Sequence, residues 1–194
     1  MIYLLRHGET EFNREGRVQG QRESRLTALG ERQAAAMADL LHGLTDGGEG
    51  WTIIASPLIR AAATARIVGE RLGLPVSYEP RLMEVFVGGW EGELRADLAR
   101  TNPGSFAGDA WYFDGPGGET YDDVLARVTA WMAEHPETDS RRLIVVSHGV
   151  AGRLMRGAYA GLSRAQTQAQ DVPQDAIYRL SGGNLERIAC AVVD

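Results

Sequence analysis

The chain opens with Met1-Ile-Tyr-Leu-Leu-Arg-His-Gly-Glu-Thr10, and this stretch decides the fold. Residues 2–5 form an apolar run that is too short for a helix and rich in β-forming residues, so we expect a buried strand. The run ends at Arg6, His7 and Gly8. Because ligands of an open parallel sheet bind beyond the carboxyl ends of its strands, a cation, an imidazole and a glycine at this point indicate an anion site.

A second unit of the same kind lies near the other end of the chain. Residues 143–146 read Leu-Ile-Val-Val and are followed by Ser147, His148 and Gly149. Two buried strands that each deliver a histidine and a glycine at their carboxyl ends predict one shared site.

Composition limits the classes of protein and partner. The chain has 194 residues, 44% hydrophobic and 24% charged, which is ordinary for one globular domain with a full core. Its net charge of -6 argues against non-specific binding to nucleic acid or to an anionic membrane. We therefore expect neither partner, and any anion site has to be local.

Targeting and cysteine signals are sparse. The opening apolar run is too short for a signal peptide or a membrane-spanning helix. The one cysteine, Cys190, excludes an internal disulfide and a multi-cysteine metal site. We expect a cytoplasmic location, and a homodimer is compatible with the sequence.

All 20 basic residues are arginine. The lack of lysine excludes a Walker-type phosphate loop, a Schiff-base mechanism and a lysine general base. Arginine binds phosphate through a planar, bidentate fork that stays charged. Genomic base composition explains the bias equally well, but the chemical exclusions stand either way.

Strand and helix patterns alternate along the chain. Strands are expected at residues 2–5, 51–55, 75–78 and 143–147, with a terminal hairpin of residues 176–180 and 184–192. Helices are expected at residues 27–44, 57–72, 93–100, 119–134 and 150–160, with Pro57 in a first helical turn. Residues 9–25, 82–92 and 102–118 read as irregular. This order predicts one α/β domain with a mostly parallel sheet between two helical layers.

Six separate blocks carry a family resemblance. They are Leu5-Arg6-His7-Gly8-Glu9-Thr10 with Asn13 and Gly20, Leu26-Thr27 with Gly30, Ala55-Ser56-Pro57 with Arg60-Ala61, Leu82 and Glu84 with Gly89-Trp90-Glu91-Gly92, Gly117-Gly118-Glu119-Thr120, and Val146-Ser147-His148-Gly149. In this order they resemble the histidine phosphatase superfamily, the phosphoglycerate mutase-like proteins. The resemblance implies a three-layer α/β/α sandwich, a single domain over residues 1–194 and a small cap at residues 84–118.

The resemblance and the chemistry together suggest roles for two histidines and two arginines. His7 is the candidate nucleophile, because an imidazole nitrogen can attack phosphorus and form a covalent intermediate. Arg6, Arg60 and His148 would balance the charge on the transferring phosphoryl group. Arg60 is expected just inside a helix, where the helix amino terminus would also face the anion.

Three further residues are candidates for substrate binding. Asn13 resembles the phosphate-contacting asparagine of the family, and its amide can donate to a phosphoryl oxygen. Gln19 lies in the same polar loop and is a weaker candidate. Gly149 lies in the turn before the helix that follows the second histidine, as Gly8 follows the first.

Glu84 is the candidate general acid. An alkoxide leaving group needs a proton, and a glutamate that is kept protonated by burial or by a nearby anion can supply it. The same carboxylate could then activate water. Met83 and Val85 flank Glu84 and fit a desolvated setting, whereas Glu91 is the competing carboxylate and better suits a helix start.

Two features bear on the substrate. Phe106, Trp111, Tyr112 and Phe113 could form an aromatic lid over its organic part, or a hydrophobic cluster beneath a loop. Many relatives have a proline before the Leu26-Thr27 pair, whereas this chain has Arg25 there. Arg25 adds a cation to the entrance loop of the site.

The compact length favours a phosphatase over a mutase, because the mutase relatives carry extra insertions over the site. We therefore predict a metal-independent phosphomonoesterase without a cofactor, acting on a small phosphorylated metabolite through a phosphohistidine. Phosphoglycerate mutase-type transfer is the alternative. A serine hydrolase with Ser147 in half of a nucleophile elbow, and a non-catalytic phosphate-binding module, are the other interpretations.

Overall fold

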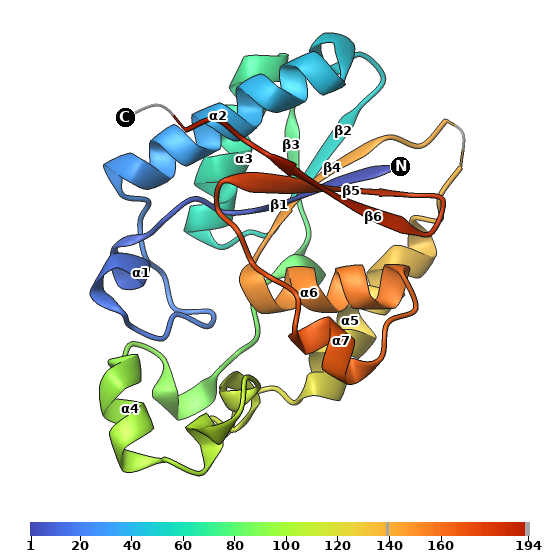
Figure 1. The fold of residues 1–194 in the computed structure, drawn as a ribbon. Helices are drawn as coiled ribbons and strands as arrows, with labels where there is room; N and C mark the ends of the chain where they lie inside the picture. Colours follow the sequence, from blue (N-terminus) through green and yellow to red (C-terminus); the bar gives the residue numbers. More distant parts are fainter. Residues whose placement is uncertain (139, 193–194) are drawn as a thin grey trace.

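The computed structural model describes residues 1–138 and 140–192, and in this part a six-stranded sheet forms the centre (Figure 1). The strands are β1 (Ile2–Arg6), β2 (Thr52–Ala55), β3 (Val76–Tyr78), β4 (Leu143–Ser147), β5 (Ala176–Ser181) and β6 (Asn184–Ala189). Their order is β3-β2-β4-β1-β5-β6. The pairs β3-β2, β2-β4 and β4-β1 are parallel, whereas β5 pairs antiparallel with both β1 and β6. The sheet is therefore mostly parallel, as predicted.

Side chains alternate across the sheet and divide the core in two. Tyr3 and Leu5 of β1 face one cluster of buried residues, and Ile2 and Leu4 face the other. Strand side chains point to opposite faces with a period of two, so a strand that is apolar throughout needs cover on both sides.

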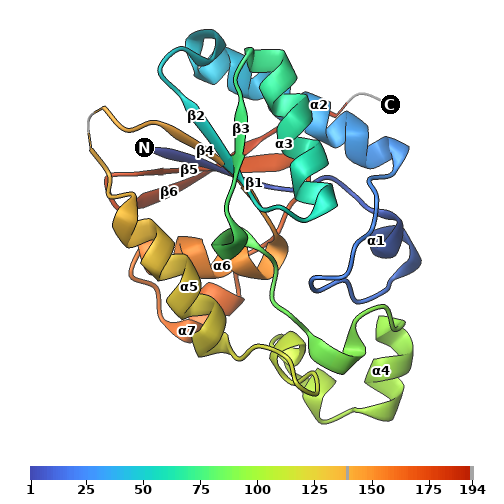
Figure 2. The ribbon, with the colours of Figure 1, turned by 180° about the vertical axis from the view of Figure 1, so that it is seen from behind.

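Helices supply that cover in two layers. α2 (Ala28–Leu44) and α3 (Ile59–Leu72) pack on one face, and α5 (Tyr121–Glu134) and α6 (Gly149–Tyr159) pack on the other (Figure 2). The predicted three-layer α/β/α sandwich is confirmed. Trp131 of α5 is fully buried under the sheet, and its truncation to alanine would cost about 3–5 kcal/mol.

Three shorter helices complete the described chain: α1 (Glu11–Glu15), α4 (Arg95–Thr101) and α7 (Arg164–Gln168). The prediction of an irregular loop over residues 9–25 was wrong for α1. Thr10 and Asn13 form a capping box there, and Gly16 ends the helix with φ 71°. Pro57 lies before the N-cap of α3 rather than in its first turn, because α3 begins at Ile59.

Outside the sandwich core, the structure shows a tight terminal hairpin turn and a separate small region at residues 84–118. The hairpin turns at Gly182 and Gly183, whose φ values of 57° and 76° suit a two-residue turn that matches the strand twist. Residues 84–118 hold α4 and short 3₁₀ turns, and lie apart from the sheet, next to the loop that carries α1 (Figure 1). Among the residues that the structure describes, no helix has the length and apolarity needed to span a membrane.

Candidate active site

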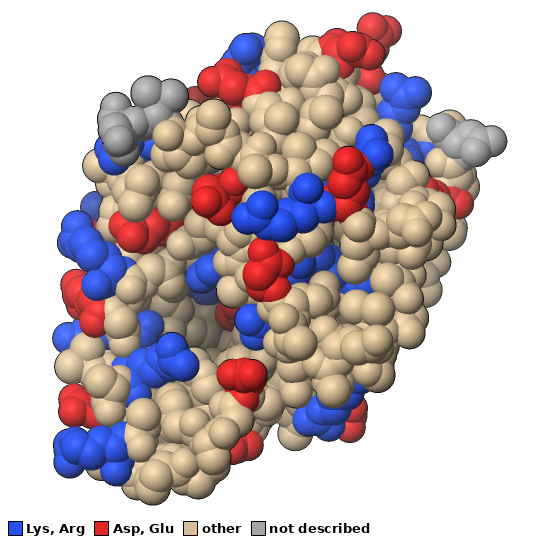
Figure 3. All heavy atoms as spheres, viewed as in Figure 1, with Lys and Arg blue, Asp and Glu red and all other residues tan. Residues whose placement is uncertain are grey.

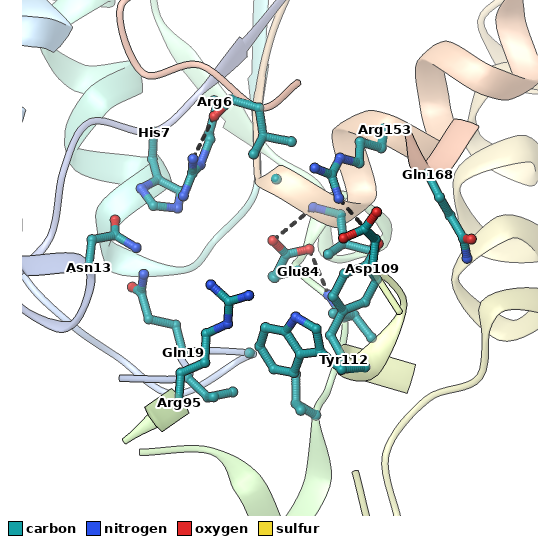
Figure 4. Close-up of a pocket in the computed structure, with 18 of the residues that line it drawn as sticks. Arg6, His7, Asn13, Gln19, Glu84, Arg95, Asp109, Tyr112, Arg153 and Gln168 are labelled. Atoms are coloured by element: carbon teal, nitrogen blue, oxygen red, sulfur yellow. Dashed lines mark hydrogen bonds between the residues drawn. The ribbon is translucent and has the colours of Figure 1, made fainter. Parts of the chain in front are cut away.

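The cavity of interest opens at the carboxyl ends of the parallel strands. Arg6 pairs with Ser147 at the end of the β1-β4 ladder, and the His7 amide donates to the Ser147 carbonyl at 3.2 Å. The two histidines that follow these strands therefore lie side by side, with ring centroids 5.2 Å apart. A cavity of about 630 Å³ lies in front of them, and Figure 4 shows the side chains that point into it. The hollow is visible on the surface in Figure 3 between blue arginine side chains.

His7 presents one ring nitrogen to this cavity. Its Nδ1 lies 2.7 Å from the Gly8 carbonyl, which only accepts, so Nδ1 carries the proton. Nε2 keeps its lone pair and accepts from Arg60 Nε at 3.2 Å. Burial lowers the pKa of His7 well below its usual value, and the charges of Arg60 and Arg6 act in the same direction. The ring is thus a neutral imidazole, and its unprotonated nitrogen is Nε2, which is hydrogen-bonded to Arg60.

His148 is equally buried but is held differently. Its Nε2 shares a 2.8 Å hydrogen bond with Ser56 Oγ at the end of β2, and its Nδ1 is buried without a partner. Burial lowers the pKa of His148 well below its usual value, followed by the effects of Arg60 and His7. His148 does not line the large cavity but lies behind it, beside a small void that Arg6 also lines.

Arg60 and Arg6 both line the cavity. Arg60 is 1% exposed, and its guanidinium donates to the carbonyls of Gly20 at 2.6 Å and Arg22 at 3.0 Å. Arg6 donates to the Val172 carbonyl at 2.6 Å, and its Nε is buried without a partner. Burial lowers the pKa of Arg6 to about 10, so the guanidinium stays charged at neutral pH. Both cations are fixed before any anion arrives.

Asn13 and Gln19 present amide groups to the cavity. Asn13 Oδ1 accepts from the Thr10 amide at 3.2 Å and from Gln174 Nε2 at 3.1 Å, which turns its amide nitrogen towards the cavity (Figure 4). Gln19 Oε1 accepts from Thr10 Oγ1 at 3.0 Å. Gln174 also donates to the His7 carbonyl at 3.2 Å, a contact that sequence reasoning missed because 167 residues separate the two.

Glu84 lies at the amino terminus of α6. Its carboxylate accepts from the backbone amides of Val85, Val150 and Ala151 at 3.0–3.1 Å. Gly149 begins α6 and lines the cavity beside it; a Cβ there would approach Glu84 Oε2 to 3.6 Å. The expected desolvated setting is only partial, because Glu84 is half-buried and three N–H donors surround its carboxyl group.

Two alternative candidates have structural positions. Glu91 accepts from the amides of Gln21 and Val87 and does not line the cavity, so it braces two loops instead of starting α4. Ser147 is fully buried, and its hydroxyl donates to the Leu82 carbonyl at 2.8 Å. A nucleophilic serine would need its oxygen exposed at the cavity, so the structure contradicts the serine hydrolase interpretation.

Aromatic residues form both of the arrangements that the sequence left open. Trp111 and Tyr112 line the cavity, whereas Phe106 and Phe113 pack behind them in the hydrophobic cluster of the 84–118 region. Arg25 is exposed and is not part of the lining.

The structure adds lining residues that the sequence analysis did not single out. Arg153 of α6 and Arg95 of α4 both line the cavity (Figure 4). A half-buried arginine at regular helical spacing has no distinctive sequence signal. Within the described chain, no group of three or more histidine, cysteine, aspartate or glutamate side chains is placed to hold a metal ion.

A charged, histidine-containing cavity at the carboxyl edge of a three-layer α/β sandwich defines a phosphoryl-transfer type of site. Residues 2–187 match the histidine phosphatase superfamily (branch 1), and the chain belongs to this family. It is 36% identical over 177 residues to the glucosyl-3-phosphoglycerate phosphatase of Mycobacterium tuberculosis, covering 84% of this chain and 74% of that protein.

Two more comparisons agree with this assignment. An Enterobacter sp. protein named "Probable phosphoglycerate mutase GpmB" is 36% identical over 165 residues, which cover 77% of this chain and 70% of the relative. A solved structure of mycobacterial glucosyl-3-phosphoglycerate phosphatase with VO3 superposes with a TM-score of 0.81 at 30% identity, over 97% of this chain and 96% of the other. The relative named as a phosphatase thus matches more of the chain than the relative named as a mutase.

Proposed function

We propose that this chain is a phosphomonoesterase that hydrolyses a small phosphorylated metabolite through a phosphohistidine at His7. The observation that carries the proposal is the state of the His7 ring: Nδ1–H is held by the Gly8 carbonyl, and the unprotonated Nε2 accepts from Arg60 in a cavity that both arginines line. A neutral imidazole in this orientation needs no separate base to become a nucleophile.

In the first step, His7 Nε2 attacks phosphorus and the P–O bond to the organic group breaks. Arg6 and Arg60 balance the charge that spreads over the phosphoryl oxygens, and the amides of Asn13 and Gln19 donate to them. His148 lies behind the cavity, with its ring beside that of His7, and we assign it to the support of the nucleophile. Gly149 lines the cavity beside Glu84, where its backbone borders the space for the substrate.

Glu84 supplies the proton to the leaving oxygen. Its carboxyl group is held by the Val150 and Ala151 amides at the start of α6 and lines the cavity. Glu84 protonates the ester oxygen as the bond breaks. In the second step it removes a proton from water, which attacks phosphorus, releases inorganic phosphate and restores neutral His7.

We also propose that residues 1–194 form one domain and that residues 84–118 act as its cap. In support, the family match spans residues 2–187, and Trp111 and Tyr112 from this segment line the cavity. A cytoplasmic location and a homodimer stay predictions from the sequence.

Phosphoglycerate mutase-type transfer is the second candidate, favoured by the relative that carries that name. Cavity size favours hydrolysis. Cavities of roughly 300–1,000 Å³ suit drug-sized ligands, so a three-carbon ester would leave much of this 630 Å³ cavity to water. The relatives named as phosphatases point to esters related to phosphoglycerate as the first substrates to test.

The test is phosphate release from a panel of small phosphate esters in the presence of EDTA. We compare the wild type with His7→Ala and with His42→Ala, a matched control that removes a histidine of α2 outside the cavity. Release by the wild type and by His42→Ala, but not by His7→Ala, supports the proposal. Interconversion of phosphoglycerates without net release would favour the mutase, and loss of activity in EDTA would contradict a metal-independent mechanism.

A further inference from the structure

We infer that Arg127 of α5 and Glu119 form a clamp that positions Glu84 for proton transfer. The inference rests on the proposed function, because Glu84 is the residue from which that proposal takes the proton of the leaving group. Arg127 Nη2 donates to the main-chain carbonyl of Glu84 at 3.0 Å, so Arg127 acts through Glu84 and is a positioning residue.

The guanidinium of Arg127 uses all five of its N–H donors at this point. Three hydrogen bonds of 2.7–3.0 Å go to the main-chain carbonyls of Arg81, Met83 and Glu84. The other two go to the carboxylate of Glu119 at 2.9 and 3.1 Å. A guanidinium offers five donors in one plane, so this set of partners is complete and gives the fork a single orientation. Arg127 therefore fixes the course of the main chain up to Glu84.

Glu119 holds the same segment on the other side of Glu84. Its Oε2 accepts from the Phe86 amide at 2.8 Å, and its own amide donates to the Phe86 carbonyl at 2.8 Å. The side chains of Arg127 and Glu119 are only 16% and 23% exposed, and their hydrogen bonds are charge-assisted, which makes them stronger than neutral ones. Glu84 thus lies between two fixed points of the main chain.

The Gly117-Gly118-Glu119-Thr120 block of the sequence supplies this geometry. A Cβ on Gly118 would lie 2.7 Å from the Phe86 carbonyl oxygen, so only glycine allows the two segments to approach this closely. Thr120 is the N-cap of α5 and forms a capping box with Asp123, which fixes the start of the helix that carries Arg127. The block therefore brings Glu119 to Phe86 and begins α5.

The carboxyl group of Glu84 is held separately, by the Val150 and Ala151 amides at the start of α6. α5 thus holds the main chain of Glu84 and α6 holds its side chain. Proton transfer needs the two heavy atoms within hydrogen-bond reach, and a misplacement of about 1 Å can cost about 10²-fold in rate. Gln21 Nε2 also donates to the Glu84 carbonyl at 3.0 Å, so loss of Arg127 loosens Glu84 without freeing it.

The experiment compares two esters that differ in whether the leaving group needs a proton. One is the alkyl phosphate of the panel that the wild type hydrolyses fastest, and the other is p-nitrophenyl phosphate. We expect Arg127→Met to lower kcat/KM for the alkyl phosphate about tenfold to thirtyfold, because a displaced Glu84 transfers its proton less well. The value for p-nitrophenyl phosphate should change by less than about threefold. A general defect of the fold would lower both values together.

A double variant tests whether the effect runs through Glu84. Glu84→Gln already lacks the proton, so adding Arg127→Met to it should lower the alkyl phosphate value by less than about a further threefold. Arg81→Met is the matched control, because its guanidinium pairs with Glu79 and Glu134 while its carbonyl remains for Arg127. We expect this control to keep both values within about threefold of the wild type.

A conservative variant extends the comparison. Arg127→Lys keeps the charge but has three donors in place of five. We expect its ratio of the two kcat/KM values to lie between those of the wild type and Arg127→Met. A thermal melt of each variant shows whether it folds, and Arg127→Lys carries the test if Arg127→Met does not.

Three outcomes overturn the inference and leave the phosphatase proposal standing. An unchanged alkyl phosphate value in Arg127→Met would mean that Glu84 keeps its position without the clamp. Equal losses for both esters would mean that the clamp anchors residues 84–118 as a whole. A double variant that shows the product of both single losses would mean that Arg127 acts independently of Glu84. Hydrolysis of no ester by the wild type would reject the proposed function, and the inference with it.

Discussion

The two histidines at the ends of β1 and β4 come from nearly the same local sequence, yet the structure gives them different tasks. His7 uses Nδ1 to donate to the Gly8 carbonyl and keeps Nε2 for the cavity. His148 uses Nε2 for Ser56 and lies behind the cavity. Paired parallel strands bring the rings within 5.2 Å of each other. The strand pattern therefore determines where an imidazole lies, and the hydrogen-bond partner determines which nitrogen remains available.

Trapping the covalent intermediate would test this difference most strongly. We expect His7→Ala to lose at least about 10⁴-fold in kcat and to form no phosphohistidine, because the nucleophile is gone. His148→Ala should lose about 10²–10³-fold, because it removes the polar ring beside His7 but leaves the nucleophile. Mass spectrometry after a rapid quench in alkali detects the phosphohistidine and shows which histidine carries it. A phosphate found on His148 in the wild type or in His7→Ala would reverse the assignment.

Glu84 connects the comparison to the chemistry, since its carboxylate rests on the helix that follows His148. Glu84→Gln should lower the rate for alkyl phosphates about 10²–10³-fold, because general acid catalysis is lost. For p-nitrophenyl phosphate, whose leaving group needs no proton, the first step should slow much less. Stopped-flow release of nitrophenol measures that step. Equal losses for both esters would mean that Glu84 holds α6 in place and transfers no proton.

Sequence reasoning predicted the histidine half of the site better than its far wall. The two strand-end histidines, Arg6 and Arg60 lie in short local patterns, so β-pairing and helix starts were enough to bring them together. The sequence identified Glu84 as a candidate. It did not predict the hydrogen bonds from the Val150 and Ala151 amides, which are 66 and 67 residues away in the chain. Such contacts follow from packing, which local propensity does not encode.

The short helices show the same limit, and one of them left a readable signal. Ser163 and Gln166 form a capping box at the start of α7, a pattern that is visible in the sequence. α1 uses Thr10 with Asn13 instead of the usual acidic or glutamine partner, which hid it in a loop. Arg153 and Gln174 had no local signal, because only the folded cavity shows what they face.

Stability as a function of pH tests whether both rings are neutral in the folded protein. The pKa values of His7 and His148 are lowered by burial, so below the unfolded pKa of about 6.5 the unfolded chain binds more protons. The two neutral rings contribute fully to the free energy of unfolding above that pH. This contribution is lost as the pH falls below it, by about 1.4 kcal/mol per pH unit for each ring. Urea titrations at about pH 6.5 and 5.5 measure how far the free energy of unfolding decreases between these pH values. We expect a smaller decrease for His148→Gln than for the wild type. An identical decrease would mean that His148 is charged in the fold.

Ser56→Ala should have the smallest effect and gives the sharpest reading of the comparison. The variant removes the hydroxyl from His148 Nε2, 2.8 Å away, and leaves every contact of His7 in place. We expect kcat to fall about three- to tenfold with little change in KM, because the ring of His148 loses its orientation while the nucleophile keeps its own. Ser56 Oγ also accepts from the Leu58 amide, so a thermal melt must accompany the kinetics. If Ser56→Ala instead abolished phosphohistidine formation, the attack on phosphorus would depend on His148. The assignment of His7 as the nucleophile and of His148 as its support would then be wrong.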